Sequence, residues 1–236
     1  MWNNLYKRKK LNVWLDLSTY CNAACPQCHR TDPRTSDKMD WLPLIQWSID
    51  EFKKAFPVDT LKHYASFQLC GTWGDPVMNK DIYEITKYIL DFSSAKIVVN
   101  TNGSMRDPMW WWQYGYMNKD RVSVYFCVDG IDQEMHSMYR QKTDLNLVLE
   151  NLEAYAEFSK ASVFTVVFKH NEDYLKQIHS MCKKLGSHDH IFVPTDRAHK
   201  IDKFKYFDPN GELKHLEHSP KYGKVSSRTY FRVDDI

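Results

Sequence analysis

The stretch NVWLDLSTYCNAACPQCH, residues 12–29, places a short apolar segment directly before three closely spaced cysteines. The apolar and aromatic residues in 12–18 predict a buried strand. Cys21, Cys25 and Cys28 follow in the loop, with the spacing CxxxCxxC. A strand that ends in a group of thiols predicts a metal or redox site at its carboxyl end.

The rest of the chain alternates apolar runs with amphipathic segments. We expect strands at 12–18, 64–71, 95–103, 121–130, 162–171 and 190–196, and helices at 41–56, 79–93, 108–117, 143–160 and 172–186. Six such units predict an α/β fold with a parallel sheet. The strands are nearly continuous apolar runs, which is typical of strands buried on both faces. Because a closed barrel needs eight units, the pattern leaves open a partial barrel and a doubly wound sheet.

Polar and glycine-rich segments follow the predicted strands. They are GTWGDP at 71–76, NTNG at 100–103, CVDG at 127–130 and KHN at 169–171. In both candidate architectures ligands bind at the carboxyl ends of the strands. The sequence therefore predicts one site at this edge, shared with the cysteine loop.

Composition limits the classes of partner. The chain has 236 residues, 32 basic and 30 acidic side chains and a net charge of only +2, which argues against nucleic acid. No apolar run approaches the ~18 residues of a membrane span, and the start lacks the apolar region of a signal peptide. We expect a cytoplasmic protein with no membrane contact. We divide it into a core at 1–196 and a polar tail or cap at 197–236, where FDPNGELKHL (207–216) predicts a turn or hairpin.

The cysteine cluster fits two kinds of site. Three of the six cysteines are scattered and no secretion signal is evident, so a disulfide framework is disfavoured. A structural zinc site takes four ligands, and His29 directly follows Cys28, an awkward position for the same tetrahedron. A [4Fe–4S] cluster normally takes four cysteines, so three would leave one iron open. The residues alone leave a zinc-stabilised, non-catalytic binding module as the alternative to an iron–sulfur enzyme.

The motifs resemble those of the radical S-adenosylmethionine (radical SAM) superfamily over about residues 11–196. Its signature is the CxxxCxxC loop after the first strand. WGDP (73–76) is similar to the family's Gly-Gly-Glu-Pro segment, with Trp73 for the first Gly and Asp75 for Glu. NTNG matches the family's third strand ending, and CVDG resembles its Ser-Ile-Asp-Gly segment with Cys127 in place of Ser. HSMYR (136–140) resembles the segment whose Arg pairs with the carboxylate of S-adenosylmethionine.

The resemblance implies a partial (β/α)6 TIM-like barrel with parallel strands, in which Cys21, Cys25 and Cys28 hold one [4Fe–4S] cluster. Residues implied to bind S-adenosylmethionine are Gly74, Asp75, Asn102, Cys127, Asp129 and Arg140. The implied reaction uses an external electron donor of the flavodoxin or ferredoxin type. It cleaves S-adenosylmethionine to a 5′-deoxyadenosyl radical, which takes hydrogen from a substrate; we favour a peptide or protein over a nucleotide or small metabolite. Gln27 stands where the family often has an aromatic residue near the adenine, and the lack of cysteines after Cys182 predicts no auxiliary cluster.

Overall fold

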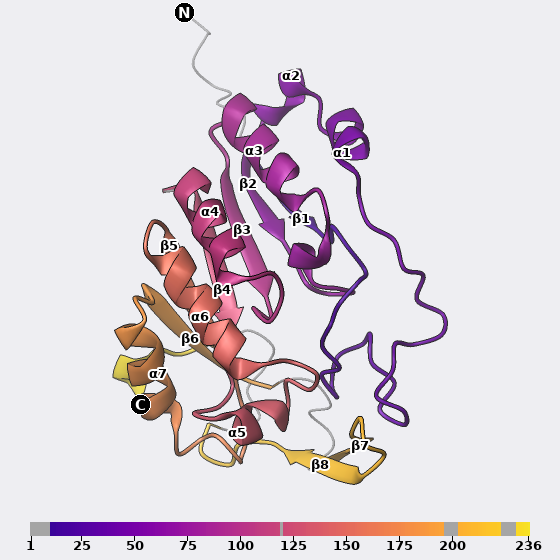
Figure 1. Cartoon of the computed structure of the whole chain (residues 1–236), viewed down its shortest axis with the longest axis vertical. Coiled ribbons are helices and arrows are strands. Elements are labelled where there is room, and N and C mark those ends of the chain that lie inside the picture. Colours follow the sequence, from indigo (N-terminus) through magenta and orange to yellow (C-terminus); the bar gives the residue numbers. More distant parts are fainter. Residues whose placement is uncertain (1–9, 119, 196–202, 223–229) are drawn as a thin grey trace, which may run out of the picture.

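The computed structural model describes residues 10–118, 120–195, 203–222 and 230–236 (Figure 1). At its centre is a six-stranded, fully parallel sheet whose strands lie side by side in chain order. They are β1 (Leu11–Leu15), β2 (Tyr64–Leu69), β3 (Lys96–Thr101), β4 (Val122–Cys127), β5 (Lys160–Val167) and β6 (Asp189–Pro194). A doubly wound sheet reverses its strand order at a switch point. This sheet does not, so the fold is the open (β/α)6 partial barrel, with β1 and β6 at its two edges.

Helices cover one side of the sheet, as Figure 1 shows for α3, α4, α6 and α7. The helices are α1 (Ile49–Ala55), α2 (Val58–Leu61), α3 (Ile82–Phe92), α4 (Pro108–Asn118), α5 (Gln133–Ser137), α6 (Leu145–Ala156) and α7 (Leu175–Lys184), with 3₁₀ turns at η1 (Pro76–Met78) and η2 (Val233–Asp235). Trp111 on α4 and Tyr155 on α6 are buried against the β4 side chain Phe126, and the buried Tyr114 of α4 packs on Tyr155. Within the described ranges, no helix is both long enough and apolar enough to cross a membrane.

In β3, β4, β6 and the second half of β2, buried and half-buried residues alternate, so the expectation of burial on both faces is wrong for these strands. Phe67 and Leu69 of β2 are fully buried toward the helices, whereas Gln68 between them is half-buried. In β3 the same alternation separates buried Val99 from half-buried Asn100. Side chains alternate between the two faces of a strand. Because helices cover one face, the half-buried residues line the interior of the open barrel.

The helix predicted over 41–56 begins only at Ile49. Ser48 caps it, since its side chain accepts a hydrogen bond from the Glu51 amide and the Glu51 carboxylate accepts one from the Ser48 amide at 2.8 Å. This reciprocal pair is a capping box, and it fixes the start of the helix at Ile49. The preceding residues lie against the chain that leaves β1, where the amide of Thr19 donates to the carbonyl of Ile45 at 2.9 Å. The other four predicted helices and all six strands are present within a few residues of their predicted bounds.

The described C-terminal residues form a separate two-stranded sheet and a short segment that pairs with β6. β7 (Lys203–Phe207) and β8 (Leu213–Glu217) pair antiparallel, so the turn or hairpin predicted at 207–216 is the end of a hairpin that begins at Lys203. Gly211 in its turn has a φ of +81°, a conformation that glycine adopts readily. Phe231 exchanges two backbone hydrogen bonds with Phe192 of β6, both at 3.0 Å. The boundary between 196 and 197 lies outside the described residues, so the division into core and cap stays a prediction.

Candidate active site

Four of the nine residues predicted for the site, Cys25, Cys28, Cys127 and Arg140, line one cavity of about 350 Å³ at the carboxyl ends of the strands. Its lining includes two of the three clustered cysteines and side chains from β2 to β6. The lining residues are Cys25, Cys28, Gln68, Gly71, Asn100, Tyr125, Cys127, Tyr139, Arg140, Phe164, Val166, Val193, Pro194 and Thr195. The open barrel thus brings segments more than a hundred residues apart in the chain to a single hollow.

The three clustered cysteines are held in a short turn after β1, and all are free thiols. The amide of Cys28 donates to the carbonyl of Cys25 at 3.0 Å, and the amide of Ala24 donates to the carbonyl of Gln141 at 3.0 Å. Cys25 is 7% exposed, while Cys21 and Cys28 are half-buried. Burial raises the pKa of the Cys25 thiol, and the guanidinium of Arg140 opposes this shift.

The surroundings of the cysteines suit iron–sulfur ligation. Within the ranges that the structure describes, no three His, Cys, Asp or Glu side chains converge closely enough to hold a single metal ion. The cysteine side chains instead share one hydrophobic cluster with Tyr139 and Phe168. An apolar shell limits solvent access and tunes a bound metal group. Three thiolates in such a shell fit a [4Fe–4S] cluster with one iron left for another ligand.

Gly74 allows the 71–76 loop to lie directly against the chain between β1 and the cysteines. A Cβ atom at Gly74 would lie 2.2 Å from the carbonyl oxygen of Ser18, so any side chain would displace backbone. The next amide, that of Asp75, donates to the carbonyl of Tyr20 at 2.8 Å. The loop therefore supports the segment that leads into Cys21.

The Asp75 carboxylate is turned into the protein, where it is 2% exposed. It accepts hydrogen bonds from the amide of Val77 at 3.0 Å, the hydroxyl of Thr101 at 3.0 Å and the amide of Asn102 at 2.7 Å. Burial raises the pKa of Asp75, and these hydrogen bonds oppose the shift. Asp75 thus ties the loop after β2 to the end of β3.

Asn102 extends this connection to the cysteine loop. Its side-chain amide donates to Asn22 Oδ1 at 2.8 Å and lies 3.7 Å from Cys21 Sγ. The side-chain amide of Asn22 in turn donates from Nδ2 to the carbonyl of Ser104 at 2.9 Å. Asp75 therefore holds Asn102, and Asn102 in turn positions Cys21. The spacing of the motifs does not reveal this arrangement.

Asp129 and Arg140, predicted separately as cofactor contacts, form a buried ion pair with each other. Arg140 Nη1 lies 3.7 Å from Cys25 Sγ, and its guanidinium stacks over the Tyr139 ring at 4.8 Å. Asp129 also accepts a hydrogen bond from the amide of Val166. Burial raises the pKa of Asp129, whereas the positive charge of Arg140 lowers it. The pair holds a guanidinium at the cavity wall beside a cysteine.

Cys127 ends β4 and lines the cavity, and burial raises the pKa of its thiol to about 12. Below it, Gln68, Asn100 and Tyr125 bring neutral polar groups from three neighbouring strands to the same cavity. We did not identify these three from the sequence. The signal was present as polar residues at alternate positions of apolar strands, which marks the second face of a sheet.

Gln27, between the second and third clustered cysteines, contacts the far edge of the barrel. The hydroxyl of Thr195 donates to Gln27 Oε1 at 2.8 Å, and both residues are buried. Thr195 follows β6, whereas Gln27 lies in the loop after β1. This hydrogen bond therefore links the two ends of the open sheet above the cavity.

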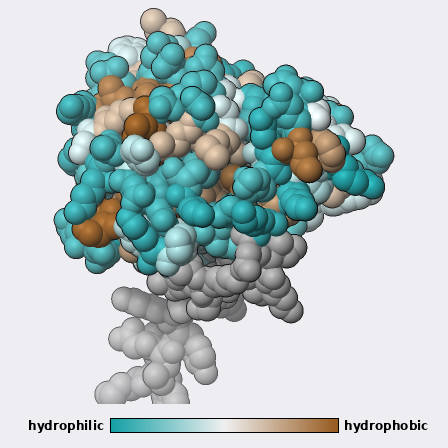
Figure 2. All heavy atoms as spheres, turned by 90° about the horizontal axis from the view of Figure 1, so that it is seen from below, coloured by the Kyte–Doolittle hydropathy of each residue, from teal (hydrophilic) through white to brown (hydrophobic). Residues whose placement is uncertain are grey.

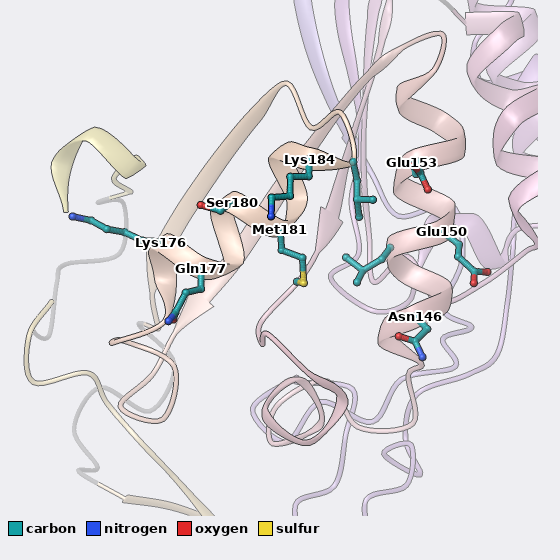
Figure 3. A pocket seen from close by; sticks show the side chains of 10 residues that line it. Asn146, Glu150, Glu153, Lys176, Gln177, Ser180, Met181 and Lys184 are labelled. Atoms are coloured by element: carbon teal, nitrogen blue, oxygen red, sulfur yellow. The ribbon is translucent and has the colours of Figure 1, made fainter.

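Two further hollows lie outside the barrel. One, of about 850 Å³, adjoins the outer side of Cys28 and is lined by Trp41, Trp73 and Phe204 among others. The other, of about 760 Å³, is a groove between α6 and α7. Figure 3 shows its side chains, with Asn146, Glu150 and Glu153 on one helix and Lys176, Gln177, Ser180, Met181 and Lys184 on the other. None of the residues predicted for the site lines this groove, so the barrel cavity is the better candidate.

Comparison with known proteins identifies relatives of this chain. A family model described as "Radical SAM superfamily" matches residues 15–182. An AdoMet-dependent heme synthase from Nitratidesulfovibrio vulgaris is 27% identical over 197 residues, which cover 80% of this chain and 50% of that protein. The chain therefore spans about half the length of this curated relative.

Solved structures show the same fold at low sequence identity. anSMEcpe with bound AdoMet superposes with a TM-score of 0.60 at 18% identity, over 78% of this chain and 51% of that chain. Streptococcus suis SuiB bound to its precursor peptide SuiA gives a TM-score of 0.61 at 12% identity, over 77% of this chain and 38% of that chain.

Proposed function

This chain belongs to the radical SAM superfamily of enzymes, which use a [4Fe–4S] cluster and S-adenosylmethionine, and we propose that Cys21, Cys25 and Cys28 hold that cluster here. Bound together and given one electron by an external donor, the two cofactors would supply a 5′-deoxyadenosyl radical able to take a hydrogen atom from a substrate. The observation that carries this assignment is that Cys25, Cys28 and Arg140 line one cavity at the carboxyl ends of the strands.

The remaining site residues divide into binding and positioning roles. We assign Arg140 to the carboxylate of S-adenosylmethionine, because a guanidinium binds a carboxylate through two parallel hydrogen bonds. Asp129 orients Arg140 through their ion pair. Because the Asp75 carboxylate already accepts three groups, we assign contacts with S-adenosylmethionine in this loop to the backbone near Gly74. Asn102 positions Cys21.

Cys127 occupies the wall of the cavity between Arg140 and the polar floor. We assign its side chain a contact with S-adenosylmethionine at the position where the family usually has serine. A thiol is a weaker hydrogen-bond donor than a hydroxyl, so this contact depends more on packing.

As substrate we propose a peptide or protein segment. The neutral amides of Gln68 and Asn100 and the hydroxyl of Tyr125 can both donate and accept hydrogen bonds, as a peptide group requires. The fold similarity to SuiB, which was solved with its precursor peptide, supports this class. A tetrapyrrole is the second candidate, favoured by the 27% identity to a heme synthase. An external one-electron donor of the flavodoxin or ferredoxin type would complete the system.

Anaerobic reconstitution with iron and sulfide tests the assignment. We expect about four iron per chain, absorbance near ~400 nm, and formation of 5′-deoxyadenosine from S-adenosylmethionine with dithionite. Cys21→Ala should lose this product, whereas the control Cys182→Ala, which alters a buried thiol on α7, should retain it. Stoichiometric zinc without iron, or full activity of Cys21→Ala, would refute the assignment.

The two substrate classes are separated by what accelerates formation of 5′-deoxyadenosine. We expect an extract fraction of peptides to increase the rate and a porphyrin dicarboxylate to leave it unchanged. The opposite result would favour the tetrapyrrole.

A further inference from the structure

The β7–β8 hairpin lies directly over the cysteine loop. Tyr206 of β7 and Leu216 of β8 are 4% and 2% exposed and belong to the same hydrophobic cluster as Cys25. Phe204 packs against this cluster together with the half-buried Cys21 and Cys28. The hairpin therefore contributes three large apolar or aromatic side chains to the surroundings of the thiols.

The hairpin presents one face to the cysteines and the other to solvent. Phe204 and Leu216 are directly opposite each other in the strand register, so their side chains share the inward face. Lys205 and His215 form the neighbouring pair and point outward, where both are exposed. Seen from the end of the molecule at which the hairpin lies, the surface is mostly hydrophilic with small, separate hydrophobic patches (Figure 2).

Three different parts of the barrel hold the hairpin in place. The amide of Phe207 donates to the carbonyl of Pro33 at 2.7 Å, beyond the cysteine loop. The hydroxyl of Tyr206 donates to the carbonyl of Met138 at 3.0 Å, just before Arg140. The amide of Lys169, after β5, donates to the carbonyl of Glu217 at 3.1 Å. An isolated two-stranded hairpin is only marginally stable, so these anchors and the apolar contacts decide its position.

Building on the proposed function, we propose that the β7–β8 hairpin is a hydrophobic cover that shields the cysteine-bound [4Fe–4S] cluster from water and dissolved oxidants. Solvent exposure and the apolar shell control the stability and potential of such a cluster. The hairpin packs against the cysteine loop, whereas Arg140 and Cys127 line the barrel cavity. It leaves the barrel cavity open beside Cys25 and Cys28, and the hollow lined by Cys28 and Phe204 marks the edge of the cover.

The test compares two leucines of the same strand. Leu216 is 2% exposed and faces the cysteines, whereas Leu213 is 59% exposed. Each is changed to alanine, the protein is reconstituted anaerobically, and iron content is measured before exposure to air-saturated buffer. Loss of the visible absorbance near ~400 nm and release of iron to a chelator then report the lifetime of the cluster.

We expect Leu216→Ala to lose its cluster about tenfold faster than the unmodified protein, because removing a buried leucine favours local opening by at least that factor. Leu213→Ala should match the unmodified protein. Equal rates in all three proteins, or equal acceleration by both variants, would overturn the proposal.

A second variant covers the case in which Leu216→Ala takes up no iron. Tyr206→Phe removes only the hydroxyl that anchors the hairpin to Met138, and we expect its cluster to be lost about threefold faster. A rate equal to that of the unmodified protein would then overturn the proposal. If the unmodified protein itself binds no iron, the proposed function fails, which is a result distinct from failure of the cover.

Discussion

Asp75→Asn tests whether this carboxylate is a structural link or a ligand contact. Asp75 Oδ2 accepts from the amide of Asn102 at 2.7 Å, and Oδ1 accepts from the amide of Val77 at 3.0 Å. Thr101 Oγ1 lies 3.0 Å from both oxygens. An asparagine side chain has one acceptor oxygen, so one of the two amides would face an NH₂ donor instead.

The loss of stability in Asp75→Asn follows from the hydrogen bonds that the substitution removes. A hydrogen bond to a charged group contributes about 1.5–3 kcal/mol, and a buried amide without an acceptor adds to the loss. We therefore expect the free energy of unfolding to fall by about 2–4 kcal/mol. In a chain of this size that corresponds to a decrease in Tm of about 5–15 °C. Because Asn102 contacts Asn22 and Cys21, the change should also loosen the cysteine loop.

Urea unfolding followed by circular dichroism measures this difference without cofactors. Asp91→Asn is the matched control, since Asp91 forms an exposed ion pair with Lys87 on α3 and should change stability by less than about 0.5 kcal/mol. If Asp75→Asn is as stable as the unmodified protein but binds S-adenosylmethionine more weakly, the structural role is refuted and direct contact is favoured.

Three further changes test other links. Gly74→Ala should lower the free energy of unfolding by about 1–3 kcal/mol or more, because its Cβ would lie 2.2 Å from the Ser18 carbonyl oxygen; an unchanged urea midpoint would contradict this close approach. Thr195→Val should cost about 1 kcal/mol through loss of the hydrogen bond to Gln27, whereas Thr195→Ser should retain most of it in the same assay. Burial, followed by the charge of His179, lowers the pKa of His190 to about 3. Below about pH 6.5 the unfolded chain therefore binds a proton at His190 more readily than the folded chain does. As the pH falls from 6 to 4, His190 should lower the free energy of unfolding by about 1.4 kcal/mol per pH unit. His190→Phe should flatten the pH dependence by that amount, and an unchanged slope would show that His190 does not titrate as buried.

The fold class followed from local patterns. Apolar runs alternating with amphipathic segments predicted six strands and the helices between them, because strand and helix periodicity are properties of neighbouring residues. The error at 41–56 has a local cause as well: apolar residues at helical spacing precede Ser48, but their backbone groups bond to the chain after β1. Periodicity cannot reveal that competing partner.

The candidate site was likewise predicted only in part from the sequence. The spacing of Cys21, Cys25 and Cys28 belongs to a single loop, so the sequence alone showed the resemblance to the family, which implied iron–sulfur rather than zinc. The family match confirms the membership. Whether these three thiols ligate the cluster stays a prediction. The polar floor of the cavity was missed, because its residues come from separate strands whose register the sequence does not state.

By itself, the sequence determined the succession of strands and helices along the chain, the position of the cysteine loop after the first strand and the acidic and basic residues near the site. Only the tertiary structure decided which of these side chains face each other. It turned Asp75 toward Thr101 and Asn102, paired Asp129 with Arg140, joined Gln27 to Thr195 and placed the hairpin over the cysteines. The physical reason is that such contacts join residues far apart in the chain, from 11 positions for Asp129 and Arg140 to 168 and more for Gln27 with Thr195 and the cysteines with the hairpin, and packing of the whole barrel sets their separation.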